Sequence, residues 1–215
     1  TMTAKASFVA PAAERAAWLA KADLVTGMVG EFPELQGVMG AYYAQHDGED
    51  PAVVEALRDQ YRPRIEAGEA SIPLVSAALH LADRIDALVG LFAVGAVPSG
   101  EKDPFGLRRA ALGIIDIYQR LAGAAAVQAT LPDLRALLDA SAITFAEGVV
   151  RPAVVEEVLD FVLERYRNSL ASQHARDAID AVLALRPHLA QVESRVRAVE
   201  AFRTLPEAES LAAAN

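Results

Sequence analysis

Apolar residues recur at steps of three and four along most of this 215-residue chain. Such spacing places the apolar side chains on one stripe of an α-helix, whereas a half-buried strand alternates apolar and polar residues. No segment of the chain sustains the alternation that is typical of a strand. The helical stripes are clearest in residues 74–92, 107–121, 154–166 and 189–202. The sequence therefore predicts an all-α protein that folds as a multi-helix bundle.

Three proline-containing pairs mark places where helices are expected to begin. They are Asp50-Pro51, Asp103-Pro104 and Arg151-Pro152. Proline suits the first helical position because its missing N–H would have no partner there, and an aspartate just before it can cap the free amides. We therefore expect one helix to begin at each of these three prolines.

Two breaks divide the chain into candidate domains. One is Gly95–Asp103, where glycine and proline separate two helical stripes, and the other is Gly123–Leu131. The last residues, RTLPEAESLAAAN, continue a helical pattern without a clear stop signal, so we expect a fragment of a longer protein. We divide the chain into a helical domain at residues 1–100 and a further helical region at residues 101–215.

Composition excludes several classes of protein. The chain is 53% apolar and 23% charged, which favours a packed core over disorder. It has no cysteine, so disulfides, thiolate zinc sites and cysteine nucleophiles are excluded. Apolar runs fall short of the roughly 18 residues that span a bilayer, and the first residues lack the pattern of a signal peptide. We expect a cytoplasmic protein that does not bind a membrane.

The net charge of −9 argues against a broadly basic surface of the kind that binds nucleic acids. The cations are unevenly distributed, however. Residues 101–215 hold 13 of the 20 lysines and arginines, and 12 of these 13 are arginine. The arginine guanidinium matches the geometry of phosphate. Any site for a polyanion is therefore expected to be local and to lie in the second half of the chain.

Carboxylates and an imidazole gather in an apolar, glycine-rich run. Residues 21–49 read KADLVTGMVGEFPELQGVMGAYYAQHDGE and contain Asp23 and His46. Residues 81–86, LADRID, add Asp83. Side chains of these types bind divalent metals, so the pattern indicates either a metal site or the remains of one.

The pattern resembles that of HD-type metallophosphohydrolases, in which histidines and aspartates from separate helices hold one or two metal ions. LADRID resembles the helix that carries the distant aspartate of that family, with Asp83 as the candidate ligand. LAKADLVT resembles the context of the His-Asp pair, but Ala22 replaces the histidine and leaves only Asp23. A methyl group cannot bind a metal, so a divalent ion would lack a closed first shell.

Two interpretations of these positions stay open. His46, or His80 one helical turn before Asp83, is a candidate to replace the missing ligand, which would give a metal-dependent phosphohydrolase acting on nucleotides. Otherwise Asp23, His46 and Asp83 mark a degenerate, metal-free HD-like core. In that case the carboxylates are partly buried and are satisfied by backbone amides or by an arginine such as Arg84.

A more specific resemblance covers almost the whole chain. Three blocks carry it: ADLVTGMVGEFPELQGVMGAYYAQHDGED, ALHLADRIDALVGLFAVGAVPSGEKDPFGLRRAALGII and FRTLPEAESLAAAN. Each is similar to the beta subunit of the bacterial heterotetrameric glycyl-tRNA synthetase. The resemblance implies that residues 1–100 form a degenerate HD-like domain. It also implies that residues 101–215 lead toward the anticodon-binding domain.

The resemblance also implies a function. That family attaches glycine to its tRNA using ATP and magnesium, and the catalytic site belongs to the alpha subunit. The chain has no glycine-rich phosphate loop and no nucleophile–base pair, which fits a chain without catalytic residues. The implied partners are the alpha subunit and glycine tRNA within a heterotetramer. No cofactor is expected in this fragment.

The first candidate for tRNA contact lies at the helix expected to begin at Pro104. A helix start presents free amides and a positive dipole to a phosphate, and Lys102, Arg108 and Arg109 add cations nearby. Asp103 weakens the case because, as a cap, it would occupy some of those amides. The alternative is that the arginines fix helix packing through carboxylates.

The other candidates for tRNA contact are less specific. Arg58 and Arg62 lie one turn apart near a helix end, where charged side chains are also typical of a solvated surface. Phe32, Tyr42 and Tyr43 are candidates to stack on bases, with a place in the helical core as the alternative.

Overall fold

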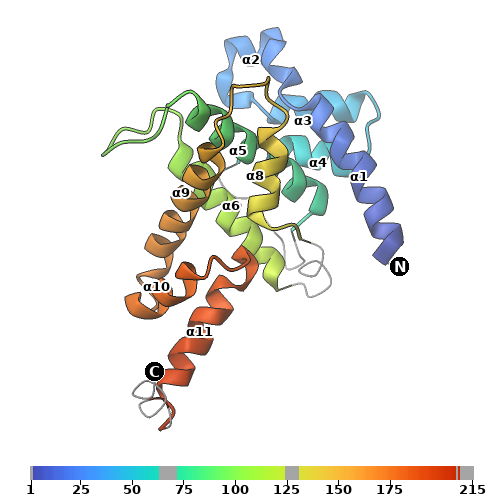
Figure 1. Ribbon diagram of the computed structural model, residues 1–215. Coiled ribbons are helices and arrows are strands. Elements are labelled where there is room, and N and C mark those ends of the chain that lie inside the picture. Colours follow the sequence, from blue (N-terminus) through green and yellow to red (C-terminus); the bar gives the residue numbers. More distant parts are fainter. Residues whose placement is uncertain (1, 63–71, 124–130, 207, 209–215) are drawn as a thin grey trace.

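The computed structural model describes residues 2–62, 72–123, 131–206 and 208, which form a set of packed helices (Figure 1). Within these ranges no strand is present apart from an isolated bridge between Ser99 and Lys102. The prediction of an all-α fold is therefore confirmed. The elements are, in order, α1 (Met2–Leu19), η1 (Ala22–Val25), α2 (Gly27–Glu31), η2 (Pro33–Leu35), α3 (Val38–His46), α4 (Pro51–Asp59), α5 (Leu74–Ala93), α6 (Leu107–Ala122), α8 (Leu134–Ala142), α9 (Ala153–Leu170), α10 (Arg176–Ala184), η3 (Leu189–Gln191) and α11 (Val192–Arg203).

Helix α5 lies at the centre of the molecule (Figure 1). It contacts α1 and α4 on one side and α6, α8 and α9 on the other. A helix with neighbours on several sides must bury more than one stripe, and 11 of the 20 residues of α5 are buried. Its buried residues include the polar Ser76, His80 and Arg84, which matter for the site described below.

Small side chains pack α1 and α4 onto the beginning of α5, and α3 onto α4. Alanine lets helix backbones approach closely, and most of the buried residues in this cluster are alanine or valine. Val75 and Leu79 are the contributions of α5. The other buried members are Ala12, Ala16, Ala41, Ala44, Val53, Val54, Ala56 and Leu57.

A larger apolar cluster joins the rest of α5 to α6, α8, α9, α10, η3 and α11. It includes the aromatic pair Phe92 and Phe161, whose ring centroids lie 5.3 Å apart in an edge-to-face arrangement. Tyr118 is fully buried, and its hydroxyl donates to the carbonyl of Pro132 at 2.7 Å. The apolar stripes predicted in residues 107–121 and 154–166 therefore face this core, whereas the stripe in residues 74–92 is divided between the two clusters.

The predicted helix starts are met to different degrees. α4 begins at Pro51, and the Asp50 carboxylate accepts a hydrogen bond from the amide of Ala52 at 2.8 Å, as predicted. α9 begins one residue after Pro152. The prediction of a helix start at Pro104 is wrong: α6 begins at Leu107, because Gly106 adopts a left-handed conformation with φ of 67° and separates the proline from the helix.

None of the described helices is both long enough and apolar enough to cross a membrane. Helix α5 supplies buried side chains to both apolar clusters. The domain boundary at residue 100 stays a prediction. The second candidate boundary, Gly123–Leu131, lies mostly outside the described residues.

Candidate functional site

Asp23 is buried where η1 meets α3, with 3% of its surface exposed. Its Oδ2 atom accepts a hydrogen bond from the amide of Gly37 at 2.5 Å. Gly37 has a φ of 78°, and a Cβ atom there would lie 2.7 Å from the Tyr61 ring, so glycine is required. A Cβ atom at Gly40 would lie 3.2 Å from the Asp23 carboxyl group. The absence of side chains at Gly37 and Gly40 therefore lets the backbone lie close to this carboxylate.

Tyr61 belongs to the same site, although no sequence motif points to it. Burial, followed by the negative charges of Asp23 and Asp83, raises the pKa of the phenol to about 12. The buried Tyr61 hydroxyl and the Asp23 Oδ1 atom have no hydrogen-bond partner among the described residues. The Tyr61 phenol is therefore protonated at neutral pH, and its pKa is affected by both aspartates that the sequence singled out.

Asp83 is paired with a cation that belongs to the chain itself. Its Oδ1 atom lies 2.7 Å from the Nζ atom of Lys21. Lys21 precedes η1 and has a φ of 66°, an uncommon conformation for a residue with a side chain. This ion pair connects the start of η1 to α5 and neutralises the carboxylate.

The three degenerate HD positions do not share one environment. Asp23 is buried against a backbone amide, Asp83 pairs with Lys21, and His46 is exposed in the last turn of α3. In the part of the chain that the structure describes, no three histidine, aspartate or glutamate side chains are placed to hold a metal ion. One oxygen of Asp23 accepts from a backbone amide, as in the structural interpretation, whereas its other oxygen has no partner among the described residues.

His80 is buried against α6. A Cβ atom at Gly113 of α6 would lie 3.3 Å from its Nε2 atom, and the side chain is 1% exposed. Burial, helped by the positive charges of Arg84 and Arg120, lowers the pKa of His80 to about 3. At neutral pH this imidazole is uncharged and forms part of the helix interface.

The Arg84 side chain of α5 lies against Gly113 of α6. It is 8% exposed, and burial lowers the pKa of its guanidinium to about 10, so it stays charged at neutral pH. The Nη2 group donates to the carbonyl of Arg62 at 2.9 Å, and the Nη1 group donates to the carbonyl of His80 at 3.3 Å. The sequence proposed Arg84 as a partner for carboxylates, but both of these hydrogen bonds go to backbone carbonyls.

The start of α6 is capped from within the chain. The Asp103 carboxylate accepts hydrogen bonds from the amides of Leu107 at 2.8 Å and Arg108 at 3.0 Å. The sequence indicated that Asp103 would cap this helix. It does so, although the helix begins three residues later than expected, at Leu107. Asp103 thus occupies two of the amides at this helix start that a phosphate could otherwise use.

Two of the three candidate cations near α6 are available to a ligand. Lys102 and Arg109 are exposed and have no carboxylate partner among the described residues. Arg108 is half-buried and donates from Nη2 to the carbonyl of Gly100 at 2.6 Å. The loop between α5 and α6 that carries Lys102 projects from the body of the molecule (Figure 1). Its turn is closed by two backbone hydrogen bonds between Ser99 and Lys102, of 3.1 and 2.9 Å.

Arg58 and Arg62 differ in availability. The Nη1 atom of Arg62 lies 3.5 Å from Asp59 Oδ1, and the Arg62 carbonyl accepts from Arg84. Arg62 is therefore engaged in the packing of α4 against α5. Arg58 is half-buried in the last turn of α4, without a carboxylate partner in the described ranges.

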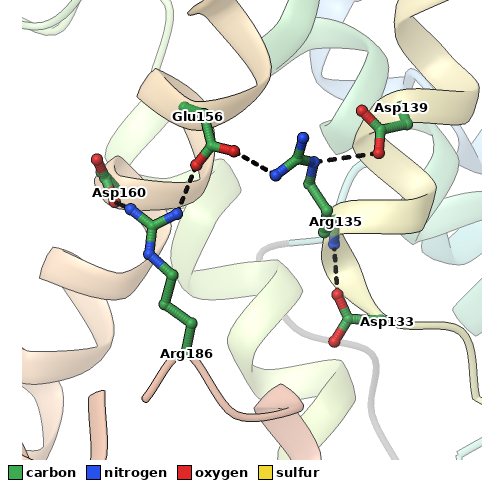
Figure 2. Close-up of polar contacts among 6 residues, drawn as sticks. All are labelled: Asp133, Arg135, Asp139, Glu156, Asp160 and Arg186. Carbon is green, nitrogen blue, oxygen red and sulfur yellow. Dashed lines mark hydrogen bonds and ion pairs between the residues drawn. The ribbon is translucent and has the colours of Figure 1, made fainter. Parts of the chain in front are cut away.

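Most arginines of the second half contact carboxylates. Figure 2 shows the densest group, in which Arg135 and Arg186 both contact the carboxylate of Glu156. Arg186 also lies 2.6 Å from Asp160, and Arg135 lies 3.1 Å from Asp139. The two arginines border a pocket of about 210 Å³ whose lining also includes four leucines. Further pairs are Arg151–Glu157, Arg167–Asp180, Arg197–Glu193 and Arg203–Asp177.

The chain is similar to known proteins over almost its full length. Residues 1–184 match the family model described as glycyl-tRNA synthetase beta subunit. Glycine–tRNA ligase beta subunits match it at 51% identity over 208 residues in Aromatoleum aromaticum, at 48% over 208 in Sodalis glossinidius and at 48% over 206 in Haemophilus influenzae. These matches cover 94–95% of this chain and 29% of each relative. The chain thus spans less than a third of the length of these curated relatives.

Proposed function

Because the chain belongs to the family of glycyl-tRNA synthetase beta subunits, we propose that it is part of the beta subunit of a glycine–tRNA ligase. In this role it contributes tRNA binding and subunit architecture to the ATP-dependent attachment of glycine to its tRNA. Its partners are the alpha subunit, which carries the catalytic site, and glycine tRNA, in a cytoplasmic heterotetramer. The complete enzyme uses ATP and magnesium, and this chain alone is inactive.

The observation that carries the tRNA-binding part is the pair of available cations Lys102 and Arg109. Exposed cations attract the phosphate backbone and release its counterions when they bind. Both lie near the start of α6, where Asp103 occupies the amides of Leu107 and Arg108. The contact is therefore between side chains and phosphates, and the projecting α5–α6 loop gives Lys102 access to a large ligand (Figure 1).

Filter binding of glycine tRNA over a series of salt concentrations tests this contact. The double variant Lys102→Ala/Arg109→Ala is expected to bind more weakly. Its plot of log affinity against log salt should be shallower, by about 1 for each phosphate that the variant no longer neutralises. The matched control is Arg197→Ala, which removes an exposed guanidinium that is already paired with Glu193.

Two outcomes would contradict the assignment. If the control weakens binding as much as the double variant, the effect is one of net charge and the assigned contact is wrong. If the unaltered chain has no salt-dependent affinity even at low ionic strength, this part of the beta subunit has an architectural role only.

The alternative of an HD-type phosphohydrolase draws no support from the described geometry, since Lys21 neutralises Asp83 and His46 is exposed. Metal analysis of the purified protein discriminates between the two functions. A stoichiometric transition metal, together with phosphatase activity that is lost in Asp83→Ala, would favour the phosphohydrolase over the role in a glycine–tRNA ligase.

A further inference from the structure

Large apolar side chains are exposed along residues 24–43, which we call the apolar segment. It comprises the end of η1, all of α2 and η2, and the first part of α3. These elements contact one another and lie at one end of the molecule (Figure 1). Of the seventeen large apolar side chains that the described residues expose, seven lie in this segment: Leu24, Val25, Met28, Phe32, Val38, Tyr42 and Tyr43. Apolar surface concentrated in this way indicates an interaction site.

The exposure is not a result of loose local structure. The Thr26 hydroxyl donates to the carbonyl of Asp23 at 2.7 Å and caps α2 by accepting from the amide of Val29. The Asp23 carboxylate accepts a hydrogen bond from the amide of Gly37 at 2.5 Å. Buried and partly buried hydrogen bonds thus hold the backbone, while apolar side chains such as Val25, which is 90% exposed, point to solvent.

Two glycines of α2 add an independent observation. Gly27 and Gly30 lack a positive φ, and a Cβ atom at either position would meet nothing within 4 Å. Glycine weakens a helix relative to alanine, and here nothing within the described chain requires it. Gly37 differs because its conformation and its contact with Tyr61 both need glycine. Bare backbone at Gly27 and Gly30 allows another surface to approach closely.

The charges on this surface favour a protein over RNA. The exposed charged side chains within the apolar segment are Glu31 and Glu34, and both are acidic. The nearest preceding cation, Lys21, is paired with Asp83 at 2.7 Å. A phosphate backbone would meet repulsion here, which argues against the base-stacking interpretation of Phe32, Tyr42 and Tyr43.

We propose that the apolar segment docks against another part of the same beta-subunit polypeptide. The matched region is 29% of the relatives' length, so most of their polypeptide is available as a partner. A covalently connected partner has a high effective concentration, so contacts of modest area are sufficient. Interfaces between domains of one chain typically bury about 600–1,500 Å². The proposal rests on family membership and not on the tRNA contact of Lys102 and Arg109, so the two can fail separately.

Cysteine labelling tests the proposal, because the chain has no cysteine of its own. The chain is placed in the beta subunit of Aromatoleum aromaticum in exchange for the matching segment. One thiol is introduced at a time, and labelling by a maleimide is read by peptide mass spectrometry. Val25→Cys is compared with the control Ile143→Cys, since these side chains are 90% and 83% exposed in this structure.

The Val25→Cys thiol is expected to react at least about tenfold more slowly than the control thiol in the long polypeptide without alpha subunit or tRNA, because labelling then requires the interface to open. Tyr42→Cys extends the measurement to α3 and should also be protected. Equal rates at all three positions would overturn the proposal. So would protection that appears only with alpha subunit, only with tRNA, or only as the protein concentration rises, since each assigns the segment to a different partner.

Discussion

Arg84 and Arg186 each hold distant parts of the chain together, but they do so in different surroundings. Arg84 is 8% exposed between α5 and α6 and donates to the backbone carbonyls of Arg62 and His80. Arg186 lies on the surface and contacts the carboxylates of Glu156 and Asp160 (Figure 2). The first arginine is enclosed by protein atoms, whereas the side chain of the second is 45% exposed to solvent.

The difference determines which perturbation each cluster is sensitive to. We call His80, Arg84 and Gly113 the buried cluster, and Arg135, Glu156, Asp160 and Arg186 the surface cluster. In the buried cluster, water cannot screen charge, and the fit of neighbouring atoms controls stability. Burial there lowers the pKa of both His80 and Arg84. In the surface cluster the hydrogen bond from Arg186 lowers the pKa of Glu156, and salt weakens the attraction. The buried cluster should therefore respond to volume and pH, and the surface cluster to ionic strength.

The largest effect is expected from Gly113→Ala, which adds volume to the buried cluster. The new Cβ atom would lie 2.5 Å from Nε and 3.0 Å from Cδ of Arg84. Arg84 is held by its two carbonyl contacts, so α5 and α6 must separate to make room. We expect the free energy of unfolding to fall by about 2–3 kcal/mol, measured by urea denaturation.

Gly30→Ala is the matched control, because its Cβ atom would meet nothing within 4 Å and the helix lacks a positive φ there. In this chain by itself it should raise the free energy of unfolding by about 0.5–1 kcal/mol. A Gly113→Ala variant as stable as the unaltered protein would mean that the buried arginine is not confined as described.

An intermediate effect is expected from acid. An unfolded histidine titrates near pH 6.5, whereas His80 in the fold has a pKa of about 3. Between these values the unfolded chain binds a proton that the folded chain does not. The contribution of neutral His80 to stability is therefore complete above about pH 6.5 and is lost as the pH falls, by up to about 1.4 kcal/mol per pH unit.

His80→Gln should make the protein less sensitive to this change. Between about pH 7 and pH 5 its free energy of unfolding should fall by about 1–2 kcal/mol less than that of the unaltered protein. His46→Gln serves as the control because His46 is exposed on α3. Identical pH profiles for His80→Gln and the unaltered protein would contradict the buried, neutral state of His80.

The smallest effect is expected from Glu156→Gln in the surface cluster. This change removes the charge that Arg135 and Arg186 share, while keeping the size of the side chain. Exposed ion pairs contribute little to stability and are screened by salt. We expect a small decrease in Tm at low ionic strength that disappears at about 1 M salt. A decrease that persists in high salt would show that this cluster behaves like the buried one.

Local patterns in the sequence predicted the helices because an apolar stripe is a property of one segment. The stripes of α5, α6 and α9 and the cap at Asp50 needed no knowledge of neighbouring helices. The start of α6 was missed because Gly106, a residue without a side chain, adopts a left-handed conformation that composition does not reveal. Asp103 keeps its capping role across this turn.

The candidate site was predicted less completely than the fold. Asp23 and Asp83 were singled out from motifs, and the negative charges of both raise the pKa of Tyr61. Tyr61 itself was missed because it follows the end of α4 and belongs to no pattern. Lys21 was not considered as a partner of Asp83, since 62 residues separate them along the chain and only the tertiary fold brings them to 2.7 Å.

The sequence by itself determined the helical class of this protein and its family, because both are encoded in the order of residues within single segments. Only the tertiary structure decided which cations remain available to a ligand. Arg186 meets Glu156 across 30 residues and Arg135 meets it across 21, so helix packing sets these pairs. Lys102 and Arg109 have no carboxylate partner among the described residues, which pairing along the chain could not have indicated, since Glu101 and Asp103 flank Lys102.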